Sequence, residues 1–119
     1  MRNFRELIAW QVAFELVRLI YQATERFPKS EELGLKSQMR RAGVSIPSNL
    51  AEGAGRSTKK DFSSFVTIAR SSLNELQTQA LLSTELGFLS STDMNQLQAV
   101  IDRLYGLLNG LRNSLNTEH

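Results

Sequence analysis

The side chains with the most evident chemistry are basic, and they are concentrated in one stretch of the chain. Between Lys36 and Arg70 there are seven Lys or Arg residues and two acidic residues, which gives this stretch a net charge of +5. The whole chain of 119 residues carries only +2, so the remainder is acidic. A local concentration of positive charge on a small protein is typical of a surface that binds a polyanion.

Five residues of this stretch are the predicted phosphate contacts. Lys36 and Arg40 are four residues apart, so on a helix they share one face. Arg56, Lys59 and Lys60 cluster where another helix is expected to begin. Basic residues at a helix N-terminus oppose the helix dipole, which suggests that the charge is used. The alternative is that Lys59 and Lys60 are solvated surface residues and that Arg56 pairs with a nearby acid.

Other polar and aromatic residues favour structural roles. Arg41, Ser45, Ser48 and Glu52 recur at spacings of four, three and four, which makes a polar stripe beside an apolar one. We expect Arg41 to pair with a carboxylate at a helix or subunit interface, in preference to a ligand. Asn49 is expected to cap or bridge helix ends. The nine aromatic residues are not interleaved with basic ones, so backbone-directed recognition is favoured over base stacking.

The sequence has few residues of the types that bind metal ions or act in catalysis. The chain has no cysteine, and its single histidine is His119, the last residue. We therefore expect no metal, no cofactor and no enzymatic activity. A small hydrolase or a metal protein that uses clustered carboxylates is a third hypothesis. Absence of cysteine favours a reducing, cytoplasmic location. No apolar run approaches the roughly 20 residues of a membrane-spanning helix.

Hydrophobic periodicity predicts four helices. The first extends from about Phe4 to Phe27 and ends before Pro28. The second extends from about Leu35 to Glu52 and is expected to bend at Pro47, the alternative being two short helices broken at Ser45–Pro47. The third, from about Lys59 to Leu86, begins with the capping pair Thr58 and Asp61 and ends at Gly87. The fourth begins at Ser91 or Thr92 and has an apolar seam that reaches Leu115.

Short connections between these helices predict an all-α, antiparallel up-down-up-down four-helix bundle. Residues 1–119 then form a single domain with a frayed tail from about 116 to 119. The first helix carries two apolar stripes side by side, one through Trp10 and Tyr21 in an apparent buried seam and one through Val12 and Leu16. This apolar arc is wider than one neighbouring helix requires, so we expect Trp10 and Tyr21 to contribute to packing between subunits.

Motifs along nearly the whole chain resemble those of a known family. They are W-Q-x-A at Trp10, F-P at Phe27, L-x-x-Q-x-R-R-A at Leu35, S-I-P-S-N-L-A-E-G at Ser45, G-R-S at Gly55 and S-L-x-E-L at Ser72. This pattern is similar to that of the four-helix-bundle proteins encoded as intervening sequences in large-subunit ribosomal RNA genes, which are related to the accessory protein of diversity-generating retroelements. The resemblance implies a ring-shaped homopentamer. For the retroelement relatives it also implies a basic surface that binds nucleic acid and a partner reverse transcriptase.

Two functional hypotheses follow. The first is a non-enzymatic homo-oligomer that binds structured nucleic acid, RNA before DNA, through Lys36, Arg40, Arg56, Lys59 and Lys60. The second is a protein-interaction scaffold in which the wide apolar arc of the first helix packs between subunits. Under either hypothesis, the predicted structural or interface residues are Trp10, Tyr21, Arg41, Asn49 and Glu52. The scaffold would dock a reverse transcriptase or another protein and have no direct role with nucleic acid.

Overall fold

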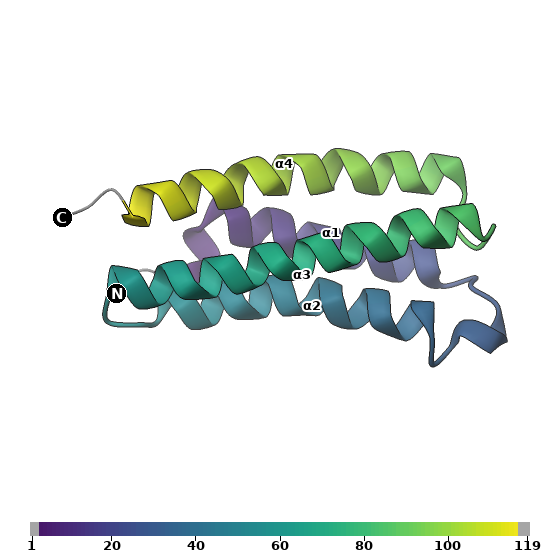
Figure 1. Ribbon diagram of the computed structural model, residues 1–119, viewed down its shortest axis with the longest axis horizontal. Coiled ribbons are helices and arrows are strands. Elements are labelled where there is room, and N and C mark those ends of the chain that lie inside the picture. The colour runs from purple at the N-terminus through teal and green to yellow at the C-terminus, as the bar shows by residue number, and fades with distance from the viewer. Residues whose placement is uncertain (1–2, 117–119) are drawn as a thin grey trace.

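Four long helices make up almost all of the computed structural model, which describes residues 3–116 (Figure 1). They are α1 (Ile8–Thr24), α2 (Leu35–Ala54), α3 (Lys59–Glu85) and α4 (Ser91–Asn116), with short 3₁₀ turns at Phe4–Glu6 and Lys29–Glu31. No strand occurs among the described residues. The predicted all-α chain with four helices is confirmed, and residues 117–119 of the predicted frayed tail lie outside the described residues.

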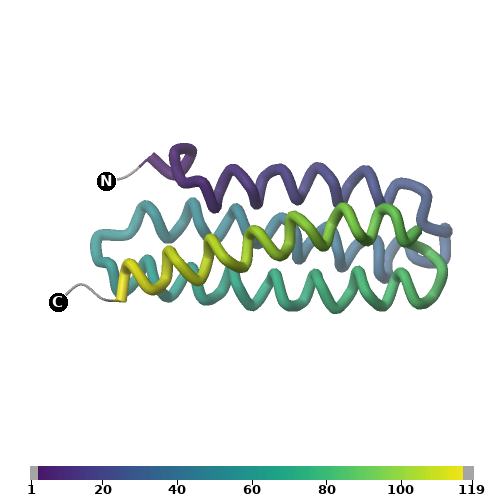
Figure 2. The backbone as a smooth tube through the Cα atoms, turned by 90° about the horizontal axis from the view of Figure 1, so that it is seen from above, coloured from purple at the N-terminus to yellow at the C-terminus, as the bar shows by residue number. Residues whose placement is uncertain are grey.

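The helices pack side by side along one axis. Each helix packs against the next one in the chain, and α1 packs against α4, whereas the diagonal pairs α1–α3 and α2–α4 have no Cα atoms within 8 Å of each other. The result is an elongated body of 49 × 23 × 20 Å. Figure 2 shows the first and last described residues at the same end of this body, which is also the end that carries the turn between α2 and α3.

The core is formed by apolar side chains that each helix contributes at spacings of three and four residues. The predicted seams of the second and fourth helices are buried, including Met39, Ile46 and Leu50 from α2 and Leu97 and Leu104 from α4. Burial of such side chains stabilises the fold by about 1.5–3 kcal/mol each. No helix in residues 3–116 combines the length and the apolar character needed to cross a membrane.

The first helix differs from its prediction in two ways. Leu7 adopts an extended conformation between the 3₁₀ turn and α1, so the helix proper begins at Ile8. Its buried face consists of Ala9, Val12, Ala13, Leu16, Ile20 and Thr24. The expected seam through Trp10 and Tyr21 was therefore wrong as a buried seam: Phe14 and Tyr21 are 50% and 42% exposed, and Trp10 is half-buried. The buried face thus combines two small alanines with Leu16 and Ile20, whereas Phe14 and Tyr21 lie outside it.

The second helix continues through Pro47 to Ala54, so the alternative of two short helices was wrong. A proline inside a helix removes one backbone donor, here the one expected at the Gly43 carbonyl. Asn49 donates its side-chain amide to the Ser45 carbonyl at 2.8 Å and to Ser45 Oγ at 3.0 Å. Asn49 thus adds hydrogen bonds to the turn that contains the proline, and it does not cap or bridge helix ends as predicted.

Local signals fix the ends of α3 and α4. Thr58 Oγ1 accepts a hydrogen bond from the Asp61 amide, as the capping prediction required. Gly87, with a φ of +84°, follows the C-terminus of α3 in the left-handed region that favours glycine. Ser90 Oγ accepts from the Asp93 amide at the start of α4. The cap at Thr58 fixes where the turn between α2 and α3 ends. This turn carries basic residues that are described next.

Candidate nucleic-acid interface

The length of α2 divides the five predicted phosphate contacts into two groups. Lys36 and Arg40 lie in the first two turns of α2, whereas Arg56, Lys59 and Lys60 lie at the turn into α3. A helix rises 1.5 Å per residue, so Lys36 and Arg56 are about 30 Å apart along the axis. The structure therefore brings together the last three residues and separates them from the first two.

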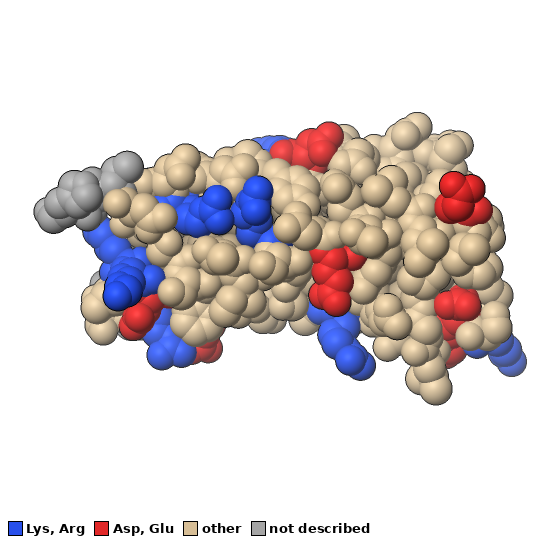
Figure 3. All heavy atoms as spheres, in the orientation of Figure 1, with Lys and Arg blue, Asp and Glu red and all other residues tan. Residues whose placement is uncertain are grey.

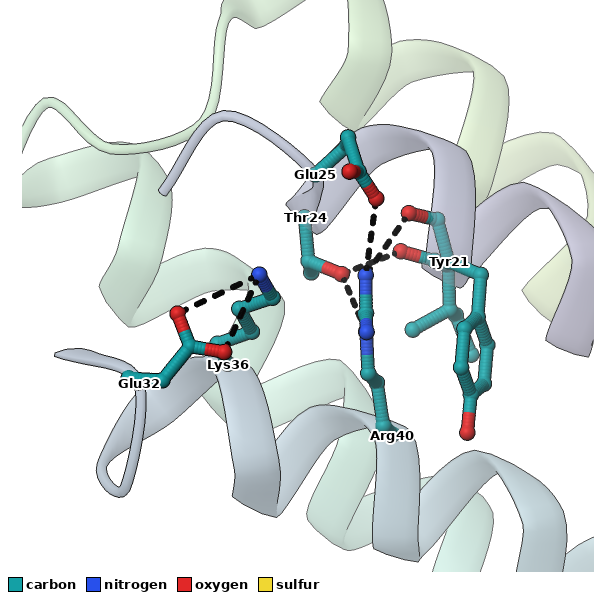
Figure 4. A network of polar contacts seen from close by, with 7 residues as sticks. Tyr21, Thr24, Glu25, Glu32, Lys36 and Arg40 are labelled. Carbon is teal, nitrogen blue, oxygen red and sulfur yellow. Dashed lines mark hydrogen bonds and ion pairs between the residues drawn. The ribbon is translucent and has the colours of Figure 1, made fainter. Parts of the chain in front are cut away.

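Arg40 is occupied by contacts with α1. Figure 4 shows its guanidinium beside Tyr21, Thr24 and Glu25 at the C-terminal end of that helix. Arg40 Nε donates to Thr24 Oγ1 at 2.9 Å, and Nη2 donates to the Tyr21 carbonyl at 3.1 Å and pairs with Glu25 at 3.4 Å. The guanidinium carbon also lies 4.2 Å from the centre of the Tyr21 ring. These contacts satisfy backbone and side-chain acceptors at the end of α1, which makes Arg40 a structural residue.

Lys36 is also paired within the molecule. Its ammonium lies 3.3 Å from Glu32, and its side chain is only 11% exposed (Figure 4). A phosphate at this position would have to displace Glu32. Lys36 and Arg40 are thus poorly placed for contact with a polyanion.

The turn between α2 and α3 presents its basic side chains to solvent. Lys59 and Lys60 are exposed, and Arg56 is about half-exposed. Arg56 Nη2 lies 3.0 Å from Glu52, and the guanidinium lies 4.8 Å from the centre of the Phe65 ring. An exposed ion pair of this kind stabilises a protein by about 0–1 kcal/mol, so a phosphate can compete with Glu52 for Arg56.

Two further basic residues lie farther along α3 and α4, and sequence analysis did not place them among the phosphate contacts. Arg70 is about 16 Å along α3 from Lys59. Ser63 of α3 donates to Asn116 of α4 at 2.8 Å, which brings the C-terminal end of α4 beside the start of α3. Arg70 of α3 donates to Asn109 of α4 at 2.8 Å, and the half-buried Arg112 lies between these two contacts along α4. Arg70 belongs to the basic stretch Lys36–Arg70 that the sequence shows, whereas Arg112 joins it only through the packing of α4 against α3, which no local sequence pattern predicts.

We call Arg56, Lys59, Lys60, Arg70 and Arg112 the basic end. Figure 3 shows most Lys and Arg side chains of the viewed face over the half of the molecule that carries the α2–α3 turn, with most Asp and Glu side chains over the other half. The acids nearest in sequence to Arg56, Lys59 and Lys60 are Glu52 and Asp61, and Glu75 lies five residues from Arg70. Basic residues outnumber these acids five to three, so a positive local field is expected at this end.

The predicted structural residues have varied surroundings. Trp10 packs against Phe4 and Phe14, with ring centres 5.3 and 5.1 Å away. Arg41 is exposed and has no ion pair or hydrogen bond among residues 3–116. Within this described part, no group of three or more His, Cys, Asp or Glu side chains is arranged to hold a metal ion.

Comparison with known proteins identifies a family and a fold. Residues 5–110 match the family model described as 23S rRNA-intervening sequence protein. A crystal structure of a protein with unknown function from the S23 ribosomal protein family of Bacteroides thetaiotaomicron is similar, with a TM-score of 0.79 and 19% sequence identity. The match covers 88% of this chain and 98% of that one. No curated protein sequence matches the chain.

Proposed function

The chain belongs to the 23S rRNA-intervening sequence protein family, and from this premise we propose that it is a non-enzymatic, self-associating helical bundle that binds structured nucleic acid, RNA before DNA. The observation that carries the proposal is the basic end. Its five basic side chains come from α3, α4 and the turn before α3, and all are exposed or half-exposed. This arrangement suits contact with a phosphate backbone more than recognition of base edges.

The aromatic residues support backbone recognition. Trp10 and Phe14 lie on α1 and do not belong to the basic end. Two rings, Phe65 and Tyr105, do lie at the basic end, and both are half-buried. An arginine lies over each of them, with the guanidinium carbon 4.8 Å from the Phe65 ring centre and 5.7 Å from the Tyr105 ring centre. Recognition of single strands depends on bases stacking on aromatic rings inside a basic groove. Structured RNA, whose phosphates lie on a regular surface, therefore fits the basic end better.

A titration tests this function. Full-length protein is added to a fluorescent RNA hairpin and to a duplex DNA, and anisotropy is followed at about 50 and about 200 mM salt. Because each neutralised phosphate contributes about 0.9 to the log–log salt slope, we expect a slope of about −4.5 for five contacts. An affinity that does not change with salt concentration, or no binding at the lower salt concentration, contradicts the proposal.

Self-association is the second part of the proposal, and the exposed stripe on α1 supports it. Trp10, Phe14, Val17 and Tyr21 follow one another at spacings of four, three and four. Phe14 and Tyr21 are exposed, Trp10 and Val17 are half-buried, and Val44 of α2 is exposed close to Tyr21. Exposed apolar side chains that form a continuous stripe mark interaction sites more often than scattered ones do. We propose that this stripe packs against another copy, and that up-down-up-down protomers form the ring that the family resemblance implies.

The assembly has its own test. Phe14→Glu places a charge in the middle of the stripe, so the mass measured by analytical ultracentrifugation should fall toward that of one chain. Ile68→Glu is the matched control, because Ile68 is 46% exposed on α3 and lies outside the stripe. A wild-type protein that is already monomeric at micromolar concentration excludes the ring.

A scaffold without a nucleic-acid role is the alternative. The same stripe would then dock another protein, such as a reverse transcriptase. An assembled ring that binds neither RNA nor DNA in the titration would favour this alternative over the first proposal.

A further inference from the structure

A polar cleft between α2 and α3 borders the pocket that Tyr21 and Val44 line, because Arg41 lines both. It has a volume of about 270 Å³ and is lined by Gln38, Arg41, Ala42, Ser45, Glu75 and Gln79. Arg41 and Arg56 are separated by about 22 Å along α2, as the helical rise requires. Arg70 is only about 7.5 Å along α3 from Glu75, but its side chain donates to Asn109 of α4. The proposed function does not use the cleft.

Gln79 is the most unusual residue of the cleft. Its side chain is buried, with only 8% of the residue exposed, and Oε1 is out of contact with solvent and has no hydrogen-bond donor among residues 3–116. No hydrogen bond in this part of the chain holds the amide nitrogen either. Buried polar groups are almost always paired, so a buried amide without partners needs a physical reason. Because nothing in the bundle holds the amide, either its acceptor or its donor can turn toward a ligand.

Two opposite charges share the cleft without pairing. Arg41 and Glu75 are both exposed, and neither makes an ion pair or hydrogen bond with the described residues. Ser45, which also lines the cleft, shares a hydrogen bond of 2.8 Å between its Oγ and Ser72 Oγ, and its Oγ accepts a hydrogen bond from Asn49 at 3.0 Å. These bonds fix the position of the Ser45 side chain. Both charges are therefore available to a ligand that carries one negative and one positive group.

We propose that this cleft binds a small zwitterion of the α-amino acid class. The ligand's carboxylate pairs with Arg41, whose guanidinium can hold a carboxylate through two parallel hydrogen bonds. The ligand's ammonium pairs with Glu75 and donates one hydrogen bond to the Gln79 amide oxygen. A simple anion or a simple cation satisfies only one of the two charges and is repelled by the other.

The size of the cleft agrees with a small ligand. Sites for drug-sized molecules have volumes of about 300–1,000 Å³, and the cleft lies just below that range. The α-carbon of an amino acid holds its ammonium and carboxylate a short distance apart, as two facing side chains of opposite charge require.

The experiment uses the ¹⁵N-labelled full chain and the side-chain amide resonance of Gln79, assigned by its loss in Gln79→Leu. L-alanine is the probe, and propionate and ethylammonium are the matched controls because each retains only one of its charges. We expect L-alanine at millimolar concentrations to shift the Gln79 resonance, with little shift from either control. Arg41→Gln and Glu75→Gln each should weaken the L-alanine response at least tenfold.

Substitutions elsewhere show whether the response belongs to the cleft. Glu15→Gln and Arg18→Gln change exposed residues of α1 and should leave the L-alanine affinity unchanged. The proposal is overturned if L-alanine leaves the resonance unmoved, or if propionate shifts it equally. A resonance that moves with protein concentration alone also overturns it, because the cleft is then a contact between copies. The test of the cleft does not depend on the folding of Gln79→Leu. Arg41→Gln and Glu75→Gln alter only exposed side chains, so these two variants test the cleft independently.

Discussion

Gly53 of α2 lies so close to Phe65 of α3 that a Cβ atom at position 53 would stand 2.7 Å from Cβ of Phe65. It would also stand 2.9 Å from Cδ1 of Phe62. Because Cβ of Phe65 cannot move without its backbone, the two helices would have to separate. This contact holds the end of α2 against α3 beside the turn that carries Arg56.

Gly53→Ala should therefore lower the free energy of unfolding. Overpacking of a close contact costs about 1–3 kcal/mol, and this exceeds the gain in helix propensity. Gly106→Ala is the control, because no heavy atom lies within 4 Å of a Cβ at that position in α4. The control should stabilise the protein by about 0.5–1 kcal/mol in urea unfolding. Equal stability gains in both variants would show that the α2–α3 contact adapts freely.

Arg40 should contribute to stability and not to RNA affinity. Arg40→Ala removes hydrogen bonds to Thr24 and to the Tyr21 carbonyl, and we expect a loss of about 2 kcal/mol in chemical unfolding. Arg40→Lys should not restore it, because an ammonium cannot reproduce the planar arrangement of donors.

The neighbouring Arg41 provides the control for Arg40. Arg41→Ala removes the same charge from an exposed side chain without partners in residues 3–116, so stability should change by at most about 0.5 kcal/mol. If Arg40→Ala weakens RNA binding and leaves stability unchanged, the original prediction of a phosphate contact is correct and the structural role is wrong.

Sequence periodicity was sufficient for most helices because each has one dominant apolar seam. Ile46 and Leu50 in α2 and Leu97 and Leu104 in α4 are buried where the pattern placed them. In α1 the pattern contained two apolar stripes of similar strength. The buried face includes Ala9 and Ala13, whose small side chains contribute little to a pattern dominated by Trp10 and Phe14. Only packing against neighbouring helices decides which stripe is buried.

The candidate site was less predictable because most of its geometry comes from different helices. The separation of Lys36 from Arg56 follows from helical rise alone and was accessible from the sequence. In contrast, the partners of Arg40 lie 15 to 19 residues away on α1, and Arg112 joins the basic end only through the packing of α4 against α3. No local pattern carries such contacts.

Ionisation of Tyr105 should lower the free energy of unfolding at alkaline pH. Burial raises the pKa of Tyr105 above its ordinary value of 10.0; the nearby Arg70 lowers the pKa and Asp102 raises it. The folded state thus holds the phenolic proton more tightly than the unfolded state does. This contribution to stability is complete below pH 10 and is lost as the pH rises through the raised pKa.

Comparison with Tyr105→Phe isolates this effect from other groups that titrate at high pH. Between about pH 8 and about pH 11, wild type should lose more unfolding free energy than the variant does. Tyr105 also donates a hydrogen bond to Asn74, so the variant is expected to be less stable at pH 8. Parallel pH profiles for the two proteins would show that the pKa of Tyr105 is the same in both states.

The basic end should account for the salt dependence of RNA binding. Arg56→Ala, Lys59→Ala and Lys60→Ala combined remove three of its five basic residues, so the log–log salt slope should become shallower by about 2 to 3 units. A matched triple variant, with alanine at Arg18, Arg26 and Lys29, removes the same charge from exposed residues outside the basic end. The two variants have equal net charge, so a contact at the basic end reduces the slope in the first variant only. If RNA binding reflects only a general electrostatic attraction, the two variants should lose affinity equally. That result would contradict the assignment of the RNA site to the basic end and would leave the fold unaffected.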